Sequence, residues 1–171
     1  EELARQLFGN PRPGAAGEYE NQANAVIWFE NYKAVIDMLG ICYFTSFWID
    51  AMALSPDDYA ALFSTGSGIA CGGDDLLHLG RRLHSVQKAF NAPHTGYSRE
   101  DDVPPKRLQE PAQSGPFQGQ RLEPDKWQVM LDEYYRAQGW DLETGWQTEE
   151  SLLSLGLGEV SAKLAAYGRL K

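Results

Sequence analysis

The feature that most constrains this chain is an apolar residue at every third or fourth position along several long segments. The clearest segment follows residues 72–75, and its apolar positions are Leu76, Leu79, Leu83, Val86 and Phe90. That spacing is the period of an α-helix with one buried face. Gly80 lies within this helix and predicts close packing against another element. No stretch alternates apolar and polar residues over the length of a strand, so the sequence predicts an all-α fold.

Several helix boundaries can be read from capping residues. Ser55 precedes Pro56 and two acids, which is a typical order for an N-cap, a first helical position and a first turn. Pro124 and Thr148 also stand where helices should begin, and Gly139 follows the apolar face that begins after Pro124. Further helices are expected over residues 1–8, 18–36 and from 160 to Gly168. Asp37 to Gly40 is expected to interrupt the second of these.

A long segment without helical period, Ala92 to Leu122, contains five prolines. A loop of about 30 residues is unusual within a compact domain and is often functional or wrapped over a partner. Because proline lowers the entropy lost on ordering, we expect this loop to be well ordered. Four charged residues should tie it to the helices: Arg99, Asp101, Asp102 and Arg107. The two acids are expected to act in turns or caps with the arginines as their ion partners, and a catalytic pair of acids is the less favoured alternative.

Charge and composition exclude several function classes. The net charge of −9 argues against nucleic acid and against an anionic membrane surface as partners. No apolar run approaches the roughly 20 residues of a membrane span. Two cysteines, Cys42 and Cys71, do not make a disulfide framework, so a reducing compartment, the cytoplasm, is the simpler expectation.

One apolar stretch, residues 34–44, carries an acid, a glycine and a thiol within six positions. Asp37 is expected to be a buried acid, which needs hydrogen-bond partners, and it could cap the turn that follows. Gly40 either turns the chain or lets the backbone approach a ligand. Cys42 is either a small core residue or a soft metal ligand. A cluster with four cysteine ligands would need the others from elsewhere, because this chain has no C-x2-C companion.

Four ordered motifs resemble the tungsten-containing aldehyde ferredoxin oxidoreductase family, and the likeness runs from about residue 20 to residue 157. Residues 37–42 resemble the second Asp-x-x-Gly motif of that family, here followed by Ile41 and Cys42. Residues 84–91 resemble its helix ending in Phe-Asn, and residues 99–107 its Arg-x-Asp-Asp loop. Residues 132–141, with Thr148 and 155–157, resemble its C-terminal signature.

The resemblance implies that residues 1–171 are the C-terminal helical domain of a longer polypeptide, with 92–122 as a long loop within it. It implies that Cys42 is one ligand of a [4Fe–4S] cluster and that Asp37, Gly40 and Ile41 contact a tungstopterin, in which two molybdopterins hold tungsten. The other cluster ligands would lie in the N-terminal remainder. No residue here matches the acid and histidine proposed for proton handling in the family, so catalytic residues stay unassigned.

The activity implied by the resemblance is oxidation of a small-molecule aldehyde to the carboxylic acid. Electrons would pass from tungsten to ferredoxin or another electron-transfer protein, and the sequence leaves a homo-oligomer open. The aromatic run 43–48 favours one alternative, the tungsten subunit of a benzoyl-CoA reductase. A second alternative is a cofactor-free helical interaction domain.

Overall fold

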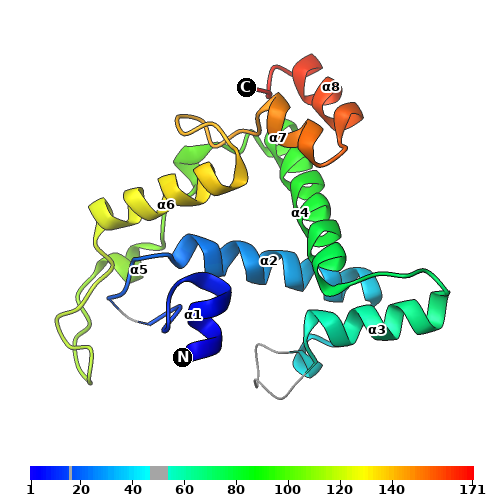
Figure 1. The fold of residues 1–171 in the computed structure, drawn as a ribbon. Coiled ribbons are helices and arrows are strands. Elements are labelled where there is room, and N and C mark those ends of the chain that lie inside the picture. The colour runs from blue at the N-terminus through cyan, green and yellow to red at the C-terminus, as the bar shows by residue number, and fades with distance from the viewer. Residues whose placement is uncertain (16, 47–53) are drawn as a thin grey trace. The chain divides into compact units, whose positions relative to one another are not determined.

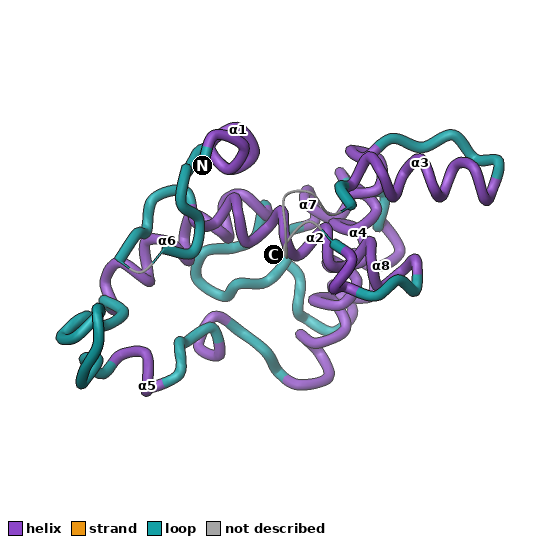
Figure 2. Tube along the Cα trace, turned by 90° about the horizontal axis from the view of Figure 1, so that it is seen from below, coloured by secondary structure: helices purple, strands orange, loops and turns teal. Residues whose placement is uncertain are grey.

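A computed structural model describes residues 1–15, 17–46 and 54–171 (Figure 1). Every named element in that part of the chain is helical, as the colouring of Figure 2 shows. The β-bridges there, Ser46 with Leu54 and Trp140 with Gln147, are isolated pairs. The predicted all-α class is therefore confirmed.

The α-helices are of very different lengths. The longest are α2 (Gln22–Leu39) and α4 (Gly73–Thr95). The others are α1 (Glu2–Phe8), α3 (Pro56–Ser67), α5 (Lys106–Gln109), α6 (Pro124–Gln138), α7 (Glu149–Ser154) and α8 (Gly158–Ala166). Two 3-10 turns, η1 (Tyr43–Thr45) and η2 (Arg99–Asp101), lie between them. In the described part of the chain, no helix combines the length and the apolar character needed to cross a membrane.

The predicted caps at Ser55, Pro124 and Thr148 are confirmed. The Ser55 side chain accepts from the Asp58 backbone N–H, and Asp58 completes a capping box. Pro124 opens α6, and the Thr148 hydroxyl accepts from the Ser151 N–H. These caps satisfy backbone groups that a helix end leaves unpaired, which is why local sequence fixes these starts.

Two compact units divide the chain: a central unit, Trp28–Lys88, and a terminal unit, Glu1–Ile27 with Ala89–Lys171. Both α2 and α4 contribute residues to each unit. Whether the 171 residues act as one domain stays a prediction.

The core of the central unit is built from three helices. Tyr32, Val35 and Ile36 of α2 and Tyr59 of α3 are completely buried there, with Leu76 of α4 beside them. Gly80 lies where α4 crosses α2, because a Cβ at this position would fall 2.1 Å from the carbonyl oxygen of Asn31. The predicted close approach at Gly80 is therefore confirmed.

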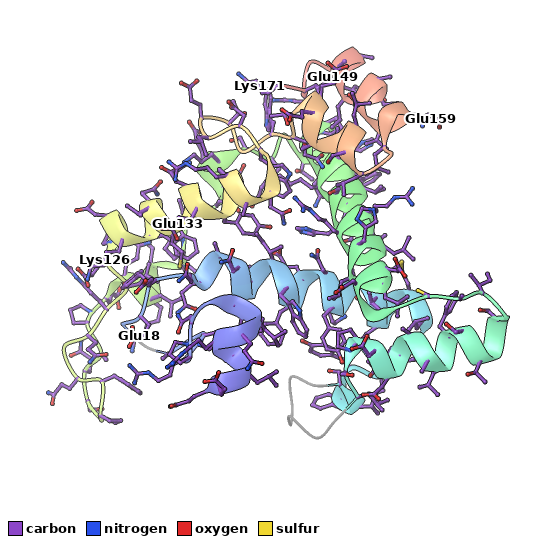
Figure 3. The ribbon with its side chains drawn as sticks, in the orientation of Figure 1. Glu18, Lys126, Glu133, Glu149, Glu159 and Lys171 are labelled. Atoms are coloured by element: carbon purple, nitrogen blue, oxygen red, sulfur yellow. The ribbon has the colours of Figure 1, made fainter. Side chains whose placement is uncertain are left out.

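Two smaller cores hold the terminal unit together. In one of them, Ala89 at the end of α4 packs with Leu152 of α7 and Leu164 of α8. Helices α7 and α8 lie side by side in Figure 1. The other joins Leu131 and Tyr135 of α6 to Trp140. Figure 3 shows Lys171 near Glu149, whose N–H donates to the Lys171 carbonyl at 3.0 Å.

The predicted loop starts later than expected, because α4 continues through Pro93 to Thr95. Proline lacks only one N–H and is less disruptive in a last turn than in mid-helix. Ala92 is 3% exposed, and the Thr95 hydroxyl donates to the Asn91 carbonyl, so packing and a side-chain bond support that turn. The rest of the predicted loop contains η2 and α5.

Candidate functional site

The motif segment, residues 37–44, begins in the last turn of α2 and belongs wholly to the central unit. Gly40 has φ +66°, and its N–H donates to the Asp37 carbonyl at 3.2 Å. The Ile41 N–H donates to the Ile36 carbonyl, also at 3.2 Å. These two bonds are the Schellman pattern, in which glycine supplies the left-handed residue. The helix therefore extends through Asp37 and ends at Gly40, where an interruption beginning at Asp37 was expected.

Gly40 also leaves room beside the backbone. It is exposed, and a Cβ built there would meet no atom of the described residues within 4 Å. The positive φ favours glycine at this position, whereas packing against the described residues does not require it. The backbone can therefore be approached closely from outside at this point.

Asp37 is exposed, so the expectation of a buried acid was wrong. Its side chain is 57% exposed and pairs with Lys33, one helical turn earlier, with an Nζ–Oδ2 distance of 2.6 Å. Val35 and Ile36 fill the core, and this turns Asp37 toward the surface of α2. An exposed pair of this kind contributes little stability, so Asp37 is not required by the fold. Lys33 was missed, although its i,i+4 spacing from Asp37 was the available signal.

Cys42 is also exposed, so it does not fill the core of the described part of this chain. Its carbonyl accepts from the Thr45 N–H at 3.1 Å and from the Thr45 hydroxyl at 2.8 Å. Ile41, just before it, packs half-buried against the central core. The backbone is thus held by η1 and by Ile41, while the thiol faces outward.

Large apolar side chains are exposed on the same short segment. Met38 is 46% exposed and Phe44 is 71% exposed. Tyr43 lies between Cys42 and Phe44, and burial raises the pKa of its hydroxyl, with Lys33 opposing the shift and Asp37 adding to it. Phe47 and Trp48, which extend the aromatic run, lie outside the described residues. The segment therefore offers an acid, a thiol and apolar surface together.

Cys71, by contrast, is used by the fold. It packs against the central core, its N–H donates to the Ser64 hydroxyl at 3.1 Å, and that hydroxyl is 3.2 Å from its carbonyl. Among the described residues, no three of His, Cys, Asp and Glu are placed to hold a metal ion. A metal centre on Cys42 would need ligands from other chain segments.

Of the two acids of the predicted loop, Asp101 takes the capping role expected of it, whereas Asp102 binds two tyrosines. Asp102 accepts hydrogen bonds from the hydroxyls of Tyr97 and Tyr135. Asp101 instead caps η2 by accepting from the Ser98 N–H at 2.9 Å. Burial, followed by the hydrogen bond to Asp102, raises the pKa of both tyrosines. Asp102 therefore joins the loop to α6.

The arginines of that loop make other contacts than the predicted ion pairs with Asp101 and Asp102. Arg99 reaches the helical body, with Nη1 at 2.7 Å from Asp132 and 2.7 Å from the Leu142 carbonyl. Arg107 pairs loosely with Glu110 at 3.9 Å, within the loop and on its surface. Of the expected ties, Arg99 and Asp102 reach the helices, whereas the contacts found for Asp101 and Arg107 are local.

The sequence matches the family model for aldehyde ferredoxin oxidoreductase, domains 2 and 3, over residues 2–157. This chain therefore belongs to the aldehyde ferredoxin oxidoreductase family. It is similar to the tungsten-containing aldehyde ferredoxin oxidoreductase of Pyrococcus horikoshii, with 34% identity over 142 residues. The corresponding enzyme of Pyrococcus furiosus is 33% identical over 141 residues, and that of Thermococcus kodakarensis 30% over 141.

The matched region is 82% of this chain but only 22% of each of these relatives. Among solved structures, the chain resembles part of the active site complex BamBC of benzoyl coenzyme A reductase, which was solved with 1,5-dienoyl-CoA. The TM-score is 0.73 at 24% identity, covering 98% of this chain and 25% of that one. At this identity the likeness shows the fold alone.

Proposed function

We propose that this chain is the C-terminal part of a tungstopterin oxidoreductase that also carries a [4Fe–4S] cluster. The whole enzyme would oxidise an aldehyde to its carboxylic acid and pass electrons to ferredoxin or a similar protein. Family membership supports the class of enzyme, and the relatives' names support the aldehyde and ferredoxin. The N-terminal remainder of the polypeptide would supply most of the cofactor site.

The observation that carries this proposal is the coincidence of Asp37, Gly40 and Cys42 on one outward-facing turn. Among the described residues, the acid is exposed and makes a surface ion pair, the glycine is open and the thiol is exposed, so none of the three fills the central core. Exposed Met38 and Phe44 beside them suggest that another surface covers the segment. These residues therefore fit a role toward a bound group.

Each residue has a role that its chemistry allows. Cys42 would ligate one iron of the cluster, because a cluster stabilises the thiolate charge. Asp37 would accept hydrogen bonds from the N–H groups of a pterin, and such bonds to a charged acceptor are strong. Gly40 would let the pterin approach the backbone. The Ile41 N–H is already donated to Ile36, so a contact from Ile41 would fall to its carbonyl.

The bound tungstopterin would supply the two-electron chemistry, and the cluster would carry the electrons onward. What this chain adds is the position of one iron ligand and a charged acceptor at the pterin edge. Asp37→Asn tests the second role, because it keeps one acceptor and removes the charge. We expect this variant to keep its iron but to lose activity or shift its redox behaviour.

A second candidate is the tungsten subunit of a benzoyl-CoA reductase-type enzyme, which would reduce an aromatic ring. Two observations favour it: the solved neighbour is a benzoyl coenzyme A reductase complex, and Phe44 adds exposed aromatic surface next to Cys42. The motif segment would have the same roles in either enzyme, so only the substrate and the direction of electron flow distinguish them.

The experiment is metal analysis of the full-length protein purified without oxygen, followed by two assays. Tungsten and iron in the preparation, with aldehyde-dependent reduction of ferredoxin, are expected. Turnover of benzoyl-CoA instead of aldehyde would favour the second candidate. A protein without either metal would overturn both and leave the helical interaction domain.

A further inference from the structure

The terminal unit contains an open cavity of about 1060 Å³. Its walls come from residues before α2, from the first turns of α2, from α5 and the segment between α5 and α6, and from Met130 of α6. Glu18 and Lys126, labelled in Figure 3, lie at this end of the unit. The cavity shares no residue with the motif segment, so it is a separate feature of the molecule.

The most informative residue in this cavity is Gln22. It is 7% exposed, and its Oε1 accepts from the Gly14 N–H at 2.8 Å. Its Nε2 is buried and has no hydrogen-bond partner among the described residues. A buried amide donor normally has an acceptor, so Gln22 indicates that an oxygen from another molecule or segment belongs here.

Backbone hydrogen bonds hold the part of the lining that comes from residues 108–122. Ala112 makes two of them: its N–H donates to the Gln120 carbonyl, and its carbonyl accepts from the Gly119 N–H, each at 2.9 Å. The Leu122 N–H donates to the Leu108 carbonyl at 2.8 Å. This wall is therefore shaped before anything binds to it.

Apolar side chains in the cavity are left open to solvent. Val26 is 45% exposed, Leu108 is 54% exposed and Phe117 is 53% exposed. The charged groups in the lining are mixed in sign, since Arg107 and Arg121 accompany Glu18, Glu110 and Glu123. A strongly anionic ligand therefore has no uniformly positive surface here. An uncharged oxygen acceptor flanked by an apolar group fits better.

We propose that this cavity is the docking site for an extended segment of the N-terminal remainder of the same polypeptide. One main-chain carbonyl of that segment accepts from Gln22 Nε2, and one apolar side chain packs among Val26, Leu108 and Phe117. The chain spans 22% of the length of its relatives, so a long polypeptide is available as the occupant. Covalent linkage makes such docking favourable at modest affinity. The inference rests on the proposed function, which requires that remainder.

Photo-cross-linking of the full-length polypeptide tests this proposal. The variant Phe117→p-benzoylphenylalanine is irradiated, and the products are mapped by mass spectrometry. The expected product joins position 117 to a residue N-terminal to Glu1 of the same chain. Val129→p-benzoylphenylalanine is the matched control, since Val129 is 59% exposed but does not line the cavity. It should not give that product.

Gln22→Glu sharpens the test, because it keeps an acceptor for Gly14 and removes the amide donor. We expect the cross-link yield from position 117 to fall by up to about tenfold, as for one lost hydrogen bond. A cross-link to a second copy or to another protein, or none at all, would overturn the docking site. Metal content separates the two proposals: metals without the cross-link overturn only the docking site, and the cross-link without metals overturns only the proposed function.

Discussion

Two acids show how differently this chain uses its charged residues. Asp102, in the terminal unit, accepts from two tyrosine hydroxyls and joins the loop to α6. Asp37, in the central unit, is 57% exposed and is bound by one lysine of its own helix. The fold accounts for Asp102 and leaves Asp37 unexplained. The carboxylate of Asp37 is therefore available to a bound group, whereas that of Asp102 is already used within the fold.

The same contrast separates the interior of the central unit from its motif segment. Around Gly80 the helices are so close that no Cβ fits. Around Gly40 a Cβ would meet nothing. Substitutions in the closed regions should therefore lower stability, whereas substitutions in the motif segment should leave stability nearly unchanged and affect cofactor loading.

The largest effect on stability is expected from Gly80→Ala. Its Cβ would clash with the Asn31 carbonyl, so the helices must separate, and the free energy of unfolding should fall by about 2 kcal/mol or more. Gly66→Ala is the matched control, because Gly66 lies in α3 with open space around it. That change should raise stability by about 0.5–1 kcal/mol. Urea unfolding that gave both variants the same sign would contradict the close crossing.

A smaller loss is expected from Asp102→Asn. The variant removes the charge of an acceptor shared by two tyrosine hydroxyls but keeps one acceptor oxygen, which should lower the free energy of unfolding by about 1–2 kcal/mol. Asp101→Asn, on the neighbouring surface cap, should cost about 1 kcal/mol or less. Thermal unfolding of the two variants checks the difference. Equal losses would mean that the tyrosine bonds do not hold the loop.

Acid should weaken the protein partly by protonating two carboxylates, those of Asp58 and Asp141, that accept hydrogen bonds in the fold. Hydrogen bonds from the Ser55 N–H and hydroxyl lower the pKa of Asp58 below 3.8, and the Thr144 hydroxyl chiefly lowers that of Asp141. A lowered pKa gives stability that is present above the unfolded pKa and is lost as the pH falls through the folded one. The Asp58→Asn, Asp141→Asn double variant should therefore show a shallower loss of stability below about pH 4. Parallel curves for the two proteins would count against these bonds.

The smallest effects on stability are expected in the motif segment. Asp37→Asn removes an exposed ion pair, which should change the free energy of unfolding by about 0.5 kcal/mol or less. Phe44→Ser replaces a side chain that is 71% exposed and should be equally mild for the chain without cofactors. If either variant lowered the free energy of unfolding by more than about 2 kcal/mol, these residues would stabilise the fold itself, and the motif segment would not differ from Asp102 in this respect.

Much of the fold could be predicted because helix signals are local. Ser55 and Thr148 act on backbone groups within three residues, so their roles were visible in the sequence. The partners of Asp102 could not be predicted, since Tyr135 is 33 positions away and only the folded loop brings them together. The motif residues could be picked out by resemblance, but the exposure of Asp37 could not, because the apolar run around it suggested burial.

The central claim is that Cys42 ligates a cluster whose remaining ligands lie elsewhere in the full-length protein. Its most direct test compares Cys42→Ser with Cys71→Ser by iron content and electron paramagnetic resonance of the reduced protein. The account predicts that Cys42→Ser loses or distorts the [4Fe–4S] signal, because it removes an exposed thiol with no part in the core. It predicts a normal signal for Cys71→Ser, whose thiol packs against that core. A normal cluster in folded Cys42→Ser protein would contradict it.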